Sequence, residues 1–147
     1  MSPRPARGAV LAFDFGEKRI GVAVGELELA IPHALTVIAA EDNDSRFAAI
    51  AALITEWRPV RLVVGIVTHA DGAAHETGRL ARRFGQRLHG RFGLDVDYVD
   101  ERLTSLAAEA ALRDAGVRAD KRAALLDAAA AAEILRSWFA VPPKNST

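Results

Sequence analysis

The sequence contains no cysteine, which excludes disulfide bonds, thiolate chemistry and cysteine-ligated zinc. It has no excess charge of either sign, because 19 basic side chains balance 19 acidic ones. This balance argues against a uniformly basic nucleic-acid binder but leaves room for a local basic patch. Long apolar runs are also missing: the first one is too short for a signal peptide or a membrane span and is interrupted by Asp14. We therefore expect a cytoplasmic protein without a membrane partner.

The length of 147 residues suits one domain of ordinary size, and 50% hydrophobic residues are enough to build a core. No internal repeat or low-complexity linker divides the chain. Residues 1–7 and 142–147 are expected to be loose tails, because both segments combine proline with polar or charged residues.

The stretch Ala9–Val24, AVLAFDFGEKRIGVAV, indicates a strand, a turn and a second strand. Its nearly continuous apolarity is typical of a central strand that is buried on both faces. Asp14 falls at the end of the first strand, where a buried charge needs a metal ion, a basic residue or strong hydrogen-bond donors. Gly16 permits the turn, and Lys18 and Arg19 place positive charge beside the acid. A plain hairpin with an aspartate-capped turn is the alternative.

Helix and strand patterns alternate along the rest of the chain, which predicts an α/β fold with parallel strand pairing. Asp42 or Asp44 offers an N-cap for the first helix, and Pro59 ends that helix. The segment Ile66–Gly72 is expected to be a loop. The expected elements are further strands at 34–39, 61–65 and 94–99, and helices at 45–57, 74–91, 104–115 and 121–139.

The helix expected at 74–91 carries arginines beside its apolar side, and no acidic residue lies between Thr77 and Leu94. Unpaired basic rows of this kind can contact phosphates. A solvated face in an arginine-rich protein is the alternative. The row consists of Arg79, Arg83, Arg87 and Arg91, with Arg82 beside it.

Two further carboxylates have unusual surroundings. Glu101 follows a predicted strand, and Asp127 shares the apolar face of the last helix with small alanines that permit close packing on the sheet. If the sheet is mixed and this helix crosses it, both acids can approach Asp14, and converging carboxylates require cations. Hard oxygen ligands suit Mg²⁺ or Mn²⁺, and two such ions about 4 Å apart serve phosphodiester cleavage. Three unrelated surface or capping acids are the alternative.

These residues belong to four motifs in a fixed order. The motifs are Asp14–Val24, Val63–Gly65, Val99–Ser105 with Glu109, and Asp127–Ala130 with Ile134 and Leu135. Together they resemble the YqgF/RuvX family, the Holliday-junction-resolvase-like nucleases of bacteria, and the resemblance extends from Gly8 to Phe139. It implies an RNase H-like fold, in which a central mixed five-stranded sheet is flanked by helices.

The resemblance also implies a site and a function. The family's proposed metal-binding acids match Asp14, Glu101 and Asp127, which would hold two Mg²⁺ or Mn²⁺ ions in an endonuclease. The implied function is processing of the 5′ end of precursor 16S ribosomal RNA, with Holliday-junction resolution as the older proposal. An RNA precursor, branched DNA or a pre-ribosomal particle would be the partner, and both a monomer and a homodimer are compatible with the sequence. The residues expected to bind backbone phosphates are Lys18, Arg19, Arg102, Arg79, Arg83 and Arg87.

The sequence departs from the family pattern at two places, Gly25-Glu26 and Ile66–His69. These departures motivate a second hypothesis, a non-catalytic RNA-binding module for ribosome assembly that retains the fold. A kinase or ATPase of the actin type would also place Asp-x-Gly between two strands. That class needs a second domain of comparable size, for which 147 residues leave no room.

Overall fold

The computed structural model describes residues 5–66, 73–100 and 119–140. The loop expected at 67–72 and the helix expected at 104–115 lie outside these residues. The strands are β1 (Ala9–Phe15), β2 (Ile20–Glu26), β3 (His33–Ile38), β4 (Pro59–Ile66) and β5 (Val96–Asp100). The helices are α1 (Asn43–Trp57), α2 (Ala73–Phe92) and α4 (Ala119–Ala140), and no helix in these ranges is long and apolar enough to cross a membrane.

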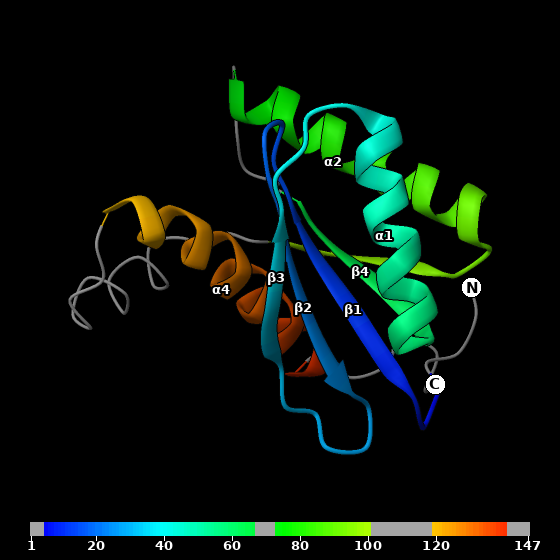
Figure 1. Cartoon of the computed structure of the whole chain (residues 1–147). Coiled ribbons are helices and arrows are strands. Elements are labelled where there is room, and N and C mark those ends of the chain that lie inside the picture. Colours follow the sequence, from blue (N-terminus) through cyan, green and yellow to red (C-terminus); the bar gives the residue numbers. More distant parts are fainter. Residues whose placement is uncertain (1–4, 67–72, 101–118, 141–147) are drawn as a thin grey trace.

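The strands form one mixed five-stranded sheet, as predicted, and their order is β3-β2-β1-β4-β5. Strands β1, β2 and β3 pair antiparallel, whereas β4 pairs parallel with both β1 and β5. Because β1, β4 and β5 run in one direction, they all end at the same side of the sheet, which we call its carboxyl end. Figure 1 shows α1 and α2 on one face of the sheet and α4 on the other.

The prediction that β1 is a central, doubly buried strand is confirmed. The four residues from Val10 to Phe13 are all 0% exposed. Leu11 and Phe13 point toward α1 and α2, whereas Val10 and Ala12 point toward α4, because successive side chains of a strand alternate between its faces. The same alternation determines which face of the sheet each polar side chain of a strand occupies.

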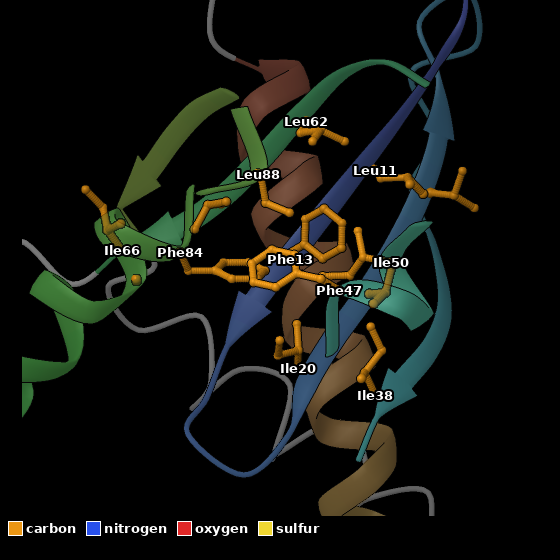
Figure 2. Close-up of a cluster of buried hydrophobic side chains, with 14 residues drawn as sticks. Leu11, Phe13, Ile20, Ile38, Phe47, Ile50, Leu62, Ile66, Phe84 and Leu88 are labelled. Atoms are coloured by element: carbon orange, nitrogen blue, oxygen red, sulfur yellow. The ribbon is translucent and has the colours of Figure 1, made fainter. Parts of the chain in front are cut away.

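The core beneath α1 and α2 is built around aromatic rings (Figure 2). The ring of Phe84 meets that of Phe13 edge to face, with centroids 5.8 Å apart, and lies 5.9 Å from the ring of Phe47. Leu88, one turn after Phe84, is fully buried. The predicted apolar side of α2 therefore faces the sheet.

Most element boundaries differ from the predictions by one or two residues, and the starts of α1, β4 and β5 have a local cause. Helix α1 begins two residues early at Asn43, after the predicted cap Asp42, whose carboxylate accepts the backbone N–H of Ser45 at 2.8 Å. Strand β4 begins already at Pro59, because Arg58 takes a left-handed conformation that ends the helix and turns the chain at once. Strand β5 begins at Val96 instead of residue 94, after the turn at Gly93, where φ is +67°.

Candidate metal and nucleic-acid site

Asp14 lies next to the end of β1, at the carboxyl end of the sheet. It is half-buried, in contrast to the fully buried residues before it. Its cross-strand partner is Gly21 of β2, and directly opposed residues of an antiparallel pair share one face. By the alternation along β1, this face is the one that α4 covers.

Gly21 is the point at which α4 touches the sheet. A Cβ atom at this position would lie 1.9 Å from the backbone oxygen of Asp127, so only glycine allows this approach. The contact fixes Asp127 above β2, beside the strand position that opposes Asp14. The predicted close packing of the alanine-rich helix is thus observed, and two of the three predicted acids lie on one face at one end of the sheet.

The carboxylate of Asp127 already has a partner. Arg19 Nε donates to Asp127 Oδ2 at 2.6 Å, and the two side chains are 46% and 23% exposed. Arg19 and Lys18 both come from the exposed turn between β1 and β2. Arg19, predicted from the sequence as a phosphate contact, is therefore also the counter-ion of a predicted metal ligand.

Arg46 holds this turn in place, and the sequence analysis missed it. Its side chain is 4% exposed, and its Nη2 donates to the carbonyl oxygen of Gly16 at 2.7 Å and to that of Glu17. Its Nε donates to the carbonyl of Ala40. Burial lowers the pKa of Arg46, and nearby acids, Glu41 first, oppose this effect. The sequence feature that could have indicated its burial is its position next to Phe47, on the inner side of α1.

The third predicted acid, Glu101, and the neighbouring Arg102 lie outside the described residues. Asp100 ends β5 at the carboxyl end of the sheet and is half-buried. Within the described parts of the chain, no group of three or more histidine or acidic residues could hold a metal ion. The structure therefore brings together Asp14 and Asp127, and leaves the place of Glu101 a prediction.

The arginine row of α2 lies on the other face of the sheet. Its core residues Phe84 and Leu88 pack with α1, opposite α4. Arg91, at the end of the row, stacks on Phe47 with its Cζ 4.3 Å from the ring centroid, and so takes part in packing. The outward residues are Arg79, Arg82 and Arg83, which are exposed, and Arg87, which is half-exposed. A nucleic acid must therefore pass around the sheet to reach both the row and the acids.

A second buried arginine, also missed, ties β4 to β5 and α4. Arg61 is 3% exposed, and its Nη1 lies 3.1 Å from Oδ1 of Asp97. Trp138 Nε1 donates to Oδ2 of the same carboxylate at 2.8 Å. Asp97 interrupts the apolar pattern of the strand expected at 94–99. It is the counter-ion of a core arginine and an anchor for the far end of α4.

The departure from the family pattern at Gly25-Glu26 is far from the acids. Glu26 opposes Ala9 at the start of β1, so it lies at the other end of the sheet from Asp14. A Cβ atom at Gly25 would approach the ring of Phe139 to 3.0 Å. This departure therefore affects the packing of α4 and does not alter the candidate site. Of the second departure, Ile66 is a buried residue of β4, and 67–69 lie outside the described residues.

Comparison with known proteins adds a family to this geometry. Residues 8–141 match the RuvX family, described as Holliday junction resolvase. Proteins of Dechloromonas aromatica and Methylobacillus flagellatus, both named "Putative pre-16S rRNA nuclease", are 59% and 53% identical to the chain. These alignments cover 92% and 93% of the chain and 92% and 96% of the relatives.

Among solved structures, RuvC of T. thermophilus, determined in complex with a Holliday junction substrate, superposes with a TM-score of 0.56 at 18% identity. The match covers 90% of this chain and 93% of that chain, and at this low identity it shows the shared RNase H-like fold alone. The expected fold is thereby confirmed. From the matched family and these close relatives, the chain belongs to the RuvX (YqgF) family.

Proposed function

We propose that this chain is a metal-dependent endonuclease that hydrolyses phosphodiester bonds, and that its substrate is the 5′ region of precursor 16S ribosomal RNA in a cytoplasmic pre-ribosomal particle. One observation carries the proposal: Gly21 brings Asp127 of α4 onto the sheet face to which Asp14 points. The names of the relatives supply the substrate class.

The donor set fits a hard divalent cation. Asp14 and Asp127 offer carboxylate oxygens from a strand and a helix, and Glu101 would add a third carboxylate. Two such ions, when bound, would polarise the phosphate and make a water molecule more acidic. The acids of this chain would hold the ions, and Asp14 would do so from the end of a central strand.

The basic residues of the β1–β2 turn would position the substrate. The ion pair between Arg19 and Asp127 is partly exposed, so a phosphate can compete for the guanidinium. Arg19 would then exchange the carboxylate for the phosphate and leave Asp127 available to a cation. Lys18, exposed in the same turn, would contact a neighbouring phosphate.

The test compares cleavage of single-stranded precursor RNA, duplex RNA and a four-way DNA junction in Mg²⁺ or Mn²⁺. Asp14→Asn and Asp127→Asn should each lower the rate by about a thousandfold, because a metal ligand contributes several kcal/mol to the transition state. Asp44→Asn, which removes an exposed acid from the first turn of α1, is the matched control and should cleave normally. Unchanged cleavage by a folded Asp14→Asn variant would falsify the metal site, and preferred cleavage of the junction would favour a resolvase.

One observation favours a second function, a non-catalytic RNA-binding module. Asp127, a predicted metal ligand, is already engaged by Arg19, an arrangement that also serves a purely structural role. Calorimetric titration with Mg²⁺ separates the two functions. Tight RNA binding without measurable Mg²⁺ binding would favour the module.

A further inference from the structure

A pocket of about 320 Å³ lies along β5, away from the acids. Strand β5 ends the strand order of the described sheet, so one of its sides faces outward. Because side chains alternate along a strand, residues of both sheet faces reach this side. The pocket is lined by Gln86, His89, Asp95 and Tyr98, and by Arg61 and Asp97.

The pocket is lined by residues from both faces of the sheet: the face with Asp14 and Asp127 and the face with the arginine row of α2. Tyr98 packs on the α2 side of the sheet, whereas Asp97 reaches Trp138 of α4 on the other side. Strand β5 runs from the pocket to the carboxyl end of the sheet, where Asp14 lies. A strand of nucleic acid that leaves the acids and rounds β5 would contact the pocket and the neighbouring arginines of α2 on the same side of the sheet.

The chemistry of the lining suits a base better than a phosphate. The charge of Arg61 is balanced by Asp97, and Asp95 adds another carboxylate, so the pocket has no net attraction for an anion. Tyr98 contributes an aromatic ring, and Gln86 and Asp95 contribute hydrogen-bonding groups of the kind that pair with base edges. A Cβ atom at Gly85 would lie 2.5 Å from Tyr98 Oη, so the glycine lets the ring lie against the helix.

Phosphate contacts are available at the rim of the pocket. Arg82 and Arg83 precede Gln86 by four and three residues, so they are its neighbours on the surface of α2. Both are exposed, and the guanidinium of Arg82 stacks on Tyr98 with Cζ 5.3 Å from the ring centroid. The rim is therefore basic while the pocket itself is neutral or acidic, as an unpaired nucleotide requires.

We propose that this pocket binds one unpaired base of the single-stranded RNA that flanks the cleaved bond, and that Arg82 and Arg83 hold the neighbouring phosphates. This proposal rests on the proposed function, because the strand is its substrate. It assigns the arginines of α2 to the flank of the substrate and not to the scissile phosphate.

The test measures binding by the full-length Asp14→Asn variant, in which cleavage is blocked. Fluorescence anisotropy is recorded with single-stranded precursor RNA in which one nucleotide at a time is made abasic, so that every phosphate remains. Hydrogen bonds to the edge of one base contribute enough to predict about a tenfold loss of affinity at one position, with little loss elsewhere. Adding Gln86→Ala or His89→Ala should lower the affinity for intact RNA and remove the position-specific loss.

Two charge variants separate the rim from the pocket. Arg83→Gln should weaken binding to every RNA of the abasic series alike and make binding less dependent on salt, because it removes one phosphate contact. Arg136→Gln, which removes an exposed arginine of α4, should leave binding unchanged. If Arg83→Gln and Arg136→Gln change the RNA affinity equally, the arginines of α2 do not bind the phosphates as proposed.

The pocket assignment is overturned by an abasic series with uniform affinity, by a position-specific loss that persists in both pocket variants, or by duplex RNA binding as tightly as the single strand. Because binding is measured without cleavage, these outcomes are independent of whether the wild-type chain cuts RNA. If the wild-type chain cleaves RNA but all abasic RNAs bind with equal affinity, only the pocket proposal is refuted. If one abasic position lowers the affinity but the wild-type chain does not cleave RNA, only the nuclease proposal is refuted.

Discussion

Arg19 Nε and Asp127 Oδ2 lie 2.6 Å apart although 108 residues separate the two residues in the chain. The contact joins the β1–β2 turn to α4 directly above the Gly21 position. One guanidinium thus controls a carboxylate that we propose to bind a metal ion.

Arg19→Gln should raise the affinity for Mg²⁺, because Asp127 loses the cation that competes with the metal. The pair is partly exposed, so the expected gain is at most about fivefold. Calorimetric titration with Mg²⁺ measures it, and Arg136→Gln, which breaks an exposed arginine–glutamate pair elsewhere on α4, is the control. Weaker Mg²⁺ binding by Arg19→Gln would mean that the arginine supports the site instead of competing in it.

Gly21→Ala should displace α4 and lower the free energy of unfolding by about 1 to 3 kcal/mol, because the new methyl group meets the backbone of Asp127. Cleavage should fall with it. Gly90→Ala is the matched control, since a Cβ atom there has no neighbour within 4 Å, and it should stabilise α2 by about 0.5 to 1 kcal/mol. Urea denaturation distinguishes the two, and equal effects of the two substitutions would contradict the contact at Gly21.

Arg46→Met should destabilise the protein by about 3 kcal/mol, because the carbonyls of Gly16, Glu17 and Ala40 lose a charged donor. The β1–β2 turn should also loosen. With increasing urea concentration, the variant should therefore lose cleavage at a lower concentration than the one at which its core unfolds. Arg46→Lys should recover only part of the stability, since one ammonium group replaces donors on two different nitrogen atoms. Full recovery by lysine would show that charge alone matters.

Asp97→Ala should cost about 3 to 5 kcal/mol, because it leaves the nearly buried guanidinium of Arg61 without its carboxylate and removes the acceptor of Trp138. The double variant Arg61→Met with Asp97→Ala should be more stable than Asp97→Ala alone. Thermal unfolding followed by circular dichroism gives the comparison. A double variant that is less stable than either single one would contradict this account of the ion pair.

The N-cap residue Asp42 should make the stability of the folded protein decrease at acidic pH. The N–H of Ser45 donates to its carboxylate and holds the pKa of Asp42 below the usual 3.8. The unfolded chain therefore binds the proton more readily, so the stabilisation is present above the unfolded pKa and is lost as the pH falls through the folded one. Asp42→Ala should be less stable at neutral pH and lose less stability between about pH 5 and pH 2. Urea denaturation across this range measures it, and parallel pH profiles would refute the cap.

Residue patterns were sufficient to predict the features of the fold that depend on the burial of side chains. The continuous apolarity of Val10 to Phe13 identified the central strand, and helical spacing identified Asp127 as an acid on an inward face. Both succeed because the periods of strands and helices report directly which side chains leave water. The family motifs added the expectation of a mixed five-stranded sheet flanked by helices, whereas the order of its strands came from the structure.

The remaining features depend on partners that no local pattern encodes. Arg46 and Arg61 are buried charges, and their acceptors are backbone carbonyls and a carboxylate from other elements. The arginine row of α2 presented a different difficulty: helical periodicity tells which side of α2 is buried but not which face of the sheet it covers. For that reason the arginine row and the two described acids, Asp14 and Asp127, lie on opposite faces of the sheet, although the sequence assigns both groups to one bound nucleic acid.

The contact of α4 with Gly21 has a consequence for synthesis of the protein. Because α4 spans Ala119–Ala140, Asp127 can reach the sheet only after all five strands of the described sheet have been synthesised. Domains generally form as units during translation, and pairing of distant segments is slow. A nascent chain that lacks α4 would thus have Asp14 in place without Asp127, and the metal site that we propose would form only once α4 has packed on Gly21.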